Sequence, residues 1–86
     1  MPIVLPSGFE VTKFSDLDYD GMTVEISYMG VPVAQISHDK GMGLQEIAIP
    51  TRFSPENILF TFNLNQFLEV LKIASDALRE LHPDAQ

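Results

Sequence analysis

The chain has 86 residues, with 12 acidic and five basic side chains, no cysteine and a formal net charge of −7. This length fits a single domain, residues 1–86, and a hydrophobic fraction of 45% argues against a disordered chain. Because there is no thiol, disulfides, thiolate zinc sites and cysteine nucleophiles are also excluded.

The first half of the chain predicts three strands. Residues 1–8 contain prolines and a glycine and are expected to form an extended arm, followed by a strand over residues 9–14. The next segment, residues 15–21, is rich in Asp and Gly and is expected to be a loop. Residues 22–28 alternate between apolar and polar side chains, which predicts a half-buried strand, and residues 31–38 form its return strand.

The register of this hairpin depends on its turn at residues 29–30. A plain two-residue turn would set Val24 opposite Gln35, whereas an added bulge at the turn sets Val24 opposite Ile36. The bulged register keeps apolar side chains on one face of the sheet. We therefore expect a bulged hairpin.

The second half predicts one further strand and an ambiguous segment. Residues 44–49 read as a strand that Pro50 ends. Residues 58–62 are a short apolar run, which is either a last strand of a sheet over residues 9–62 or only the approach to the following helix. The expected fold is α+β, an antiparallel β-meander of four to five strands with one C-terminal amphipathic helix packed on one face.

Residues 64–81 have the pattern of that helix. Asn63 or Asn65 can cap its start, and Pro83 prevents its continuation. Apolar side chains recur at helical spacing and form the stripe that is expected to be buried. The members of this stripe are Leu64, Phe67, Leu68, Leu71, Ala74 and Leu78.

Three further apolar residues of the helix, Val70, Ile73 and Ala77, lie off this stripe. Ile73 projects to nearly the opposite side at about 100° per residue. Either the helix is buried over a wide arc, or these three residues form a second apolar strip. In the second case they are candidate partner-binding residues, and the partner is another protein or a second copy in a homodimer.

An acidic loop precedes the hairpin. Asp16, Asp18 and Asp20, followed by Gly21, match the opening of a calcium-binding loop, where alternate carboxylates turn toward one hard cation. The twelfth position of such a loop needs a bidentate Glu and is Ser27 here, and the flanks predict strands instead of helices. The three aspartates are therefore candidate ligands of a weak metal site, or an acidic turn whose side chains cap their own backbone.

Charge and motifs exclude most other functions. The five basic residues are scattered, so neutralisation of phosphates is weak and neither nucleic acid nor an anionic membrane is an expected partner. A basic protein surface is favoured instead. No apolar stretch approaches the roughly 20 residues of a membrane span, and the N-terminus lacks a signal-peptide pattern, so a cytoplasmic location is expected. His38 and His82, the only histidines, have no metal-ligand spacing, and we expect no catalytic residue, no cofactor and no enzyme activity.

A resemblance adds to these expectations. Residues 18–49 combine Asp-Tyr-Asp-Gly, Val-Glu-Ile-Ser-Tyr, Pro-Val-Ala-Gln-Ile-Ser and Gln-Glu-Ile-Ala-Ile, and the tail adds Phe-Asn-Leu-Asn-Gln-Phe-Leu-Glu-Val-Leu. The combination resembles a group of small uncharacterised bacterial proteins, some of which look like immunity proteins of polymorphic toxins. It implies a non-catalytic interaction protein, such as an immunity-type inhibitor of a basic toxin. The alternative is a small-ligand or weak calcium-binding module that uses the acidic loop.

Overall fold

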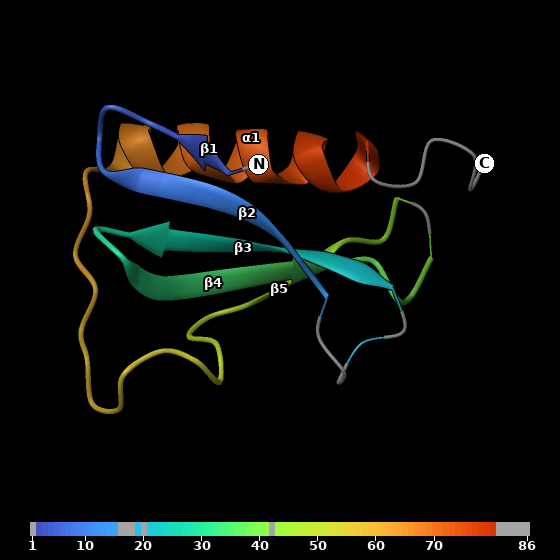
Figure 1. Ribbon diagram of the computed structural model, residues 1–86, viewed down its shortest axis with the longest axis horizontal. Coiled ribbons are helices and arrows are strands. Elements are labelled where there is room, and N and C mark those ends of the chain that lie inside the picture. The colour runs from blue at the N-terminus through green and yellow to red at the C-terminus, as the bar shows by residue number, and fades with distance from the viewer. Residues whose placement is uncertain (1, 16–18, 20, 42, 81–86) are drawn as a thin grey trace.

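The computed structural model describes residues 2–15, 19, 21–41 and 43–80. Within these residues, five strands form one antiparallel sheet in the order β1-β2-β3-β4-β5, and one helix, α1, lies on one face of it (Figure 1). This architecture confirms the predicted α+β fold with a meander of strands. The elements are β1 (Ile3–Val4), β2 (Phe9–Ser15), β3 (Met22–Tyr28), β4 (Val31–Ser37), β5 (Glu46–Ala48) and α1 (Leu64–Glu80).

The three central strands match the predicted segments, and the two edge strands differ from them. The predicted arm contains β1, in which Ile3 pairs with Val11 and Val4 pairs with Glu10. Strand β5 is only three residues long, shorter than the predicted segment 44–49. Residues 58–62 do not join the sheet and instead form the approach to α1.

The β3–β4 hairpin has the predicted register. Val24 lies opposite Ile36, and the ladder shifts beyond Ile26. The turn itself has two central residues with positive φ, Met29 at 50° and Gly30 at 84°, the backbone of a type I′ turn. The bulge therefore lies within the strands and not at the turn as predicted, and it allows apolar side chains of both strands to share one face.

The hydrophobic core lies between α1 and the sheet. Residues of α1 contact β2, β3 and β4, and the sheet contributes the largest buried side chains. The buried part of the helix has two alanines, which lets the helix axis approach the sheet closely. The core residues are Phe9, Val11, Val24, Ile26, Val33, Ala34, Ile36, Val70, Ala74, Ala77 and Leu78.

The start of α1 is fixed by Asn63. Its Oδ1 accepts a hydrogen bond of 3.0 Å from the backbone N–H of Gln66, and its carbonyl accepts the first helical bond from Phe67. A side-chain acceptor at this position satisfies one of the N–H groups that a helix leaves unpaired. Of the two predicted caps, the structure therefore uses Asn63.

The buried side of α1 includes Ala74 and Leu78 of the predicted stripe, and it also includes Val70 and Ala77, which lie off that stripe. Val70 is fully buried and Ala77 is 6% exposed, whereas Leu64 and Leu68 are 69% and 53% exposed. The prediction that Val70 and Ala77 belong to an exposed partner-binding strip is therefore wrong. The helix is turned about its axis because its small side chains fit against the bulky sheet residues, and Leu64 and Leu68 are left at the surface.

The opposite face of the sheet is polar and partly covered by residues 50–57, which pass beneath β4 (Figure 1). The Ser54 hydroxyl donates a hydrogen bond of 2.8 Å to the carbonyl of Pro32. The centres of the Phe53 and Phe14 rings lie 5.4 Å apart, edge to face. Beneath this cover, the Gln35 amide donates to the Thr23 hydroxyl at 3.0 Å. The buried side chains of Gln35 and Thr23 are thus hydrogen-bonded to each other, which limits the cost of their burial.

Gly8 should be the glycine least tolerant of substitution. Its φ is +101°, and an added Cβ would lie 2.9 Å from Met29 Sδ and 3.2 Å from Tyr28 Cε1. Its N–H donates to Leu5 and its carbonyl accepts from Met29, so the backbone cannot relax easily. We expect Gly8→Ala to lower the free energy of unfolding by about 2 kcal/mol.

Urea unfolding followed by circular dichroism measures this loss. Gly30→Ala is the matched control, because Gly30 also has positive φ but nothing lies within 4 Å of an added Cβ. Gly30→Ala should therefore cost less than Gly8→Ala. An equal or reversed order would show that the close approach of Gly8 to Met29 and Tyr28 contributes nothing.

Candidate functional site

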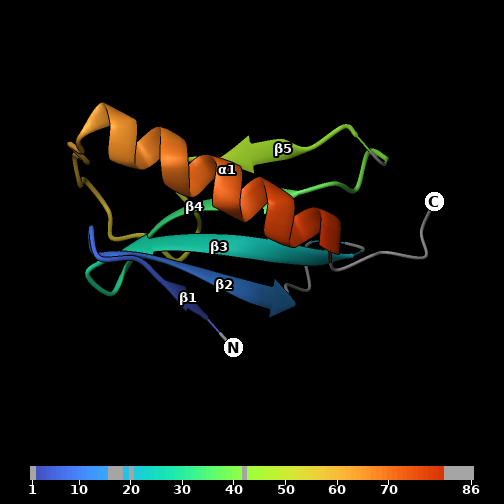
Figure 2. The same ribbon diagram turned by 90° about the horizontal axis from the view of Figure 1, so that it is seen from above.

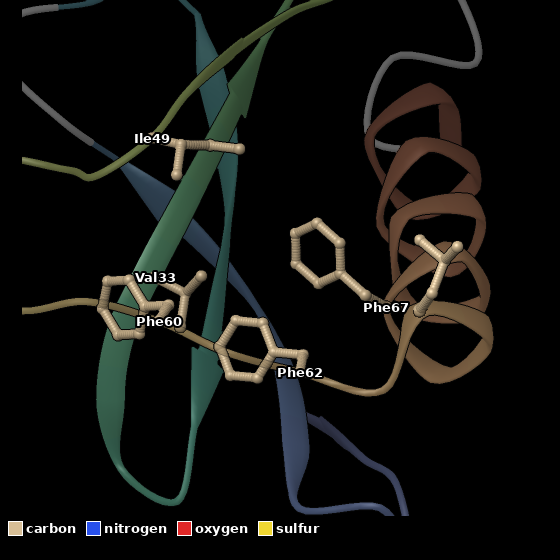
Figure 3. Close-up of a pocket in the computed structure, with 6 residues that line it drawn as sticks. Val33, Ile49, Phe60, Phe62 and Phe67 are labelled. Atoms are coloured by element: carbon tan, nitrogen blue, oxygen red, sulfur yellow. The ribbon is translucent and has the colours of Figure 1, made fainter.

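The most distinctive surface feature is an apolar hollow between the start of α1 and the sheet. Its volume is about 270 Å³, and every residue that lines it has an apolar side chain. Figure 3 shows Ile49 and Phe60 on the sheet side and Phe67 on the helix side of this space. The lining residues are Val33, Ile49, Phe60, Phe62, Leu64 and Phe67.

Local structure explains how these side chains meet. The bulge after Ile26 turns Val33 into the buried layer, and the chain after residue 57 returns from the far face to the helix start. Along this return the Phe62 ring lies 5.4 Å from Phe67 and 5.7 Å from Phe60. The hollow therefore has a rigid aromatic wall, since stacked rings restrict one another.

Exposed apolar side chains continue the hollow along the helix and β5. Ile47 pairs with the core residue Ile36, so it points to the helix side of the sheet, yet it is 44% exposed. Ser75 of α1 donates to the Gln45 side chain at 2.6 Å, which shows which side of the helix faces β5. Leu68 lies seven residues earlier on that same side. We call the lining of the hollow together with Ile47 and Leu68 the α1–β5 surface.

This surface is exposed because one helix is too narrow for the sheet. Five strands at the usual spacing span about 19 Å, whereas one packed helix covers about 10 Å. No Cα atom of α1 lies within 8 Å of one in β5. Figure 2, which views the sheet from the helix side, shows β5 beside α1 and not beneath it. The helix side of β5 is thus left without a cover among the described residues.

A second hollow lies on the other side of α1, against β1 and β2. It is lined by Ile3, Lys13, Ile73, Asp76, Ala77 and Glu80. Two residues of the predicted partner strip, Ile73 and Ala77, therefore lie beside charged groups and do not form an apolar surface with Val70. The mixed lining gives this hollow less apolar contact than the one at the helix start.

The chain's own carboxylates engage several of its cations. Lys40 Nζ lies 3.2 Å from Glu46 Oε2, and Lys72 Nζ lies 3.6 Å from Asp76 Oδ2. Arg79 also pairs with Asp76, and the Arg52 guanidinium lies 4.9 Å from the centre of the Phe53 ring. Local pairing leaves the net charge of −7 unchanged, so the field around the domain is that of an anion.

The proposed metal ligands Asp16, Asp18 and Asp20 lie outside the described residues, and the calcium-binding interpretation stays a prediction. At the described end of that loop, the Gly21 N–H donates to Asp39 Oδ1 at 3.2 Å. Within residues 2–15, 19, 21–41 and 43–80, no cluster of three His, Asp or Glu side chains is suitable for a metal ion.

Glu25 is a titratable group whose surroundings change its acidity. It lies in β3 on the face away from α1, opposite Thr12 and Gln35. Burial raises the pKa of Glu25 because the sheet replaces part of the water that would solvate the carboxylate. Between the pKa of Glu25 in the unfolded state and its higher pKa in the folded state, the folded state binds more protons than the unfolded state. The free energy of unfolding therefore falls as the pH rises through this window.

We therefore expect Glu25→Gln to stabilise the domain at pH 7 and to lose this effect near pH 4. The gain should be less than about 1 kcal/mol, because Glu25 is only half-buried and water screens its charge. Urea unfolding of both proteins at several pH values measures the difference. Glu56→Gln, in an exposed loop, is the control. A gain that persists at low pH would show that the carboxylate charge is not its cause.

Comparison with known proteins gives no match: no family model, no curated protein and no solved structure is significantly similar to this chain. The resemblance of residues 18–49 to immunity proteins therefore stays a prediction. Within the described part of the chain, no helix combines the length and the apolar character needed to cross a membrane.

The sequence missed the residues of the hollow. The sequence predicts that Phe60 and Phe62 lie in a last strand or in the approach to the helix, and that Leu64 belongs to the buried stripe. The alternation Phe60-Thr61-Phe62 directly before a helix cap is the one local signal of an aromatic cluster there. It does not indicate which other segments complete the wall.

Proposed function

We propose that this domain is a non-catalytic protein-interaction domain that binds a basic protein partner through the α1–β5 surface. An immunity-type inhibitor of a basic toxin is the specific form of this proposal. The observation that carries it is the apolar hollow, whose lining has no polar side chain and which opens beside exposed Leu64 and Leu68.

The physical argument is that of an interface hot spot. Binding energy in protein interfaces concentrates in pockets where an aromatic or aliphatic anchor is fully removed from water. The hollow at the start of α1 offers such a pocket, with a wall of Phe60, Phe62 and Phe67. Exposed Ile47 and Leu68 extend the apolar contact around it. An exposed apolar surface of this kind favours a macromolecular partner that covers it.

The charge argument selects the class of partner. A net charge of −7 attracts a cationic protein over long range and repels an anionic one. Complementary charge mainly raises the association rate, and apolar contact at the hollow then slows dissociation. Binding should therefore weaken as the salt concentration rises, because exposed charges are screened.

A photo-crosslinking amino acid at position 68, incorporated in the source cells, tests the proposal. Leu68 is 53% exposed, and Val4, which is 69% exposed at the opposite edge of the sheet, is the control position. We expect a cationic protein to be captured from position 68 and not from position 4. Capture of the same proteins from both positions, or of acidic proteins only, would contradict the proposal.

The captured protein is then purified, and its affinity is measured for the wild-type domain and for the variants Leu68→Asp and Val4→Asp. Leu68→Asp should weaken binding at least tenfold, because it places a carboxylate in the apolar contact. Val4→Asp adds the same charge far from the α1–β5 surface and should bind as the wild type does. Loss of the partner's own activity on binding identifies an inhibitor, and unchanged activity would contradict the immunity form of the proposal.

A further inference from the structure

We infer that the α1–β5 surface receives an amphipathic helix of about three turns, basic on its outer side, as the second helix of an incomplete helical layer. This inference rests on the proposed function and names the form that its partner takes. It follows from the width of the sheet, the length of the uncovered surface and the nature of the sheet edge.

The width argues for a helix. α1 contacts β2, β3 and β4 but not β5. A second helix at the usual distance of about 8–10 Å from α1 would lie about two strand spacings further along the sheet, and so above β5. Ile47 and Ile49 would form its floor, and Leu64 and Leu68 would face it from α1. These are the surroundings that a buried helix face has in a two-layer α+β domain.

The length sets the size of the partner segment. The uncovered flank of α1 begins at Leu64, beside the hollow, and ends at Ser75, which the Gln45 side chain bridges with two hydrogen bonds of 2.6 and 3.1 Å. The eleven helical steps from Leu64 to Ser75 rise about 16 Å, or three turns. A partner helix of this length would place one large apolar side chain in the hollow and two more along Ile47 and Leu68.

The edge of β5 argues against the addition of a strand. This strand has three residues, and Pro50 follows shortly after it without a backbone N–H to donate. Lys40 and Glu46 also form an ion pair at its start. Short edges with charges and proline are the features that suppress edge-to-edge pairing. The main attraction of this region is therefore its apolar face and not its backbone edge.

Charge argues against a second copy of this chain as the occupant. Two copies would bring together two domains of net charge −7. Their long-range repulsion opposes association, whereas a cationic helix is attracted. The occupant is therefore a helix that has an apolar stripe of Leu or Phe and Lys or Arg on its remaining sides.

The test uses defined peptides of about 14 residues that cover three turns and their ends. The first peptide has Leu and one Phe at helical spacing and Lys at the other positions. The second peptide has the same composition, but its apolar and Lys residues alternate as in a strand. Titration is followed by circular dichroism and by the methyl signals of Ile47, Ile49, Leu64 and Leu68. We expect the helical-spacing peptide to gain helicity, to shift these signals and to bind at least tenfold more tightly than the alternating one.

Two variants and a third peptide test whether the binding is local. Leu68→Asp should weaken binding of the helical-spacing peptide at least tenfold, and Val4→Asp should not change its affinity. The same peptide with Glu in place of Lys should not bind. The inference is overturned if neither peptide shifts the methyl signals, or if the alternating peptide binds as tightly and protects the amides of Glu46–Ala48.

These outcomes are distinct from a failure of the proposed function. If crosslinking from position 68 captures a cationic partner but the alternating peptide binds better, a protein does bind at this surface and the helical form is wrong. If position 68 captures no partner, the proposed function fails whatever the peptides do. Sedimentation of the isolated domain adds the homodimer as an outcome, and a stable dimer through Leu68 would overturn the inference.

Discussion

Val70→Asp is expected to prevent folding of the domain. Val70 has no exposed surface and lies in the centre of the contact between α1 and the sheet. A carboxylate there would be removed from water with no cation beside it in the core, at a cost of several kcal/mol. A domain of this size has a total stability of only about 5–10 kcal/mol, so most of it would be lost. Circular dichroism and urea unfolding measure the result.

Leu68→Asp is the matched control, since it makes an equally polar change two residues earlier on the same helix. Leu68 is 53% exposed, so we expect its free energy of unfolding to change by less than about 1 kcal/mol. Because Val70→Asp gives no number if the chain does not fold, Val70→Ala supplies one, with an expected loss of about 2 kcal/mol. The reverse pattern, with Leu68 sensitive and Val70 tolerant, would mean that the predicted stripe is the buried side.

Phe9→Ala is expected to cost about 4 kcal/mol. The Phe9 ring is fully buried and joins the sheet, the approach segment and the helix. Its centroid lies 4.9 Å from the rings of Tyr28 and Phe62 and 5.9 Å from that of Phe67. Removal of the ring leaves a cavity among groups that are already packed from three sides. The loss is measured as the change in urea midpoint at constant slope.

Phe53→Ala is the control for this change, because it removes the same ring from a site that is 43% exposed. It should cost about 1 kcal/mol, the value of its edge contact with Phe14 and partial burial. Phe9→Leu should lie between the two, since it refills much of the volume. Equal losses for Phe9→Ala and Phe53→Ala would contradict the placement of Phe9 at the centre of the core.

The Phe9 substitution also bears on the proposed binding surface. Phe62 and Phe67 contact Phe9 on one side and line the hollow on the other. The aromatic wall of the hollow is therefore supported from within the core. A folded Phe9→Leu protein should bind the helical-spacing peptide less tightly than the wild type, whereas Phe53→Ala should not change binding.

The central hairpin was predictable because its signals are local. Residues 22–28 alternate with a period of two, and a one-residue slip would move a whole apolar set to the wrong face. This constraint predicts the pairing of Val24 with Ile36, and the structure has this pairing. The start of α1 is predictable for a similar reason, because the cap residue Asn63 directly precedes Leu64, where the helical apolar pattern begins.

The sequence by itself determined the acidic charge, the α+β class, the hairpin register and the extent of the helix to within a residue or two. Only the tertiary structure decided which side of α1 is buried, because both Leu64 with Leu68 and Val70 with Ala77 form apolar stripes of the right period. The choice depends on which volumes fit the sheet, and periodicity contains no information on volume. The hollow likewise joins side chains from β4, the end of β5, the approach segment and α1, which no local pattern connects.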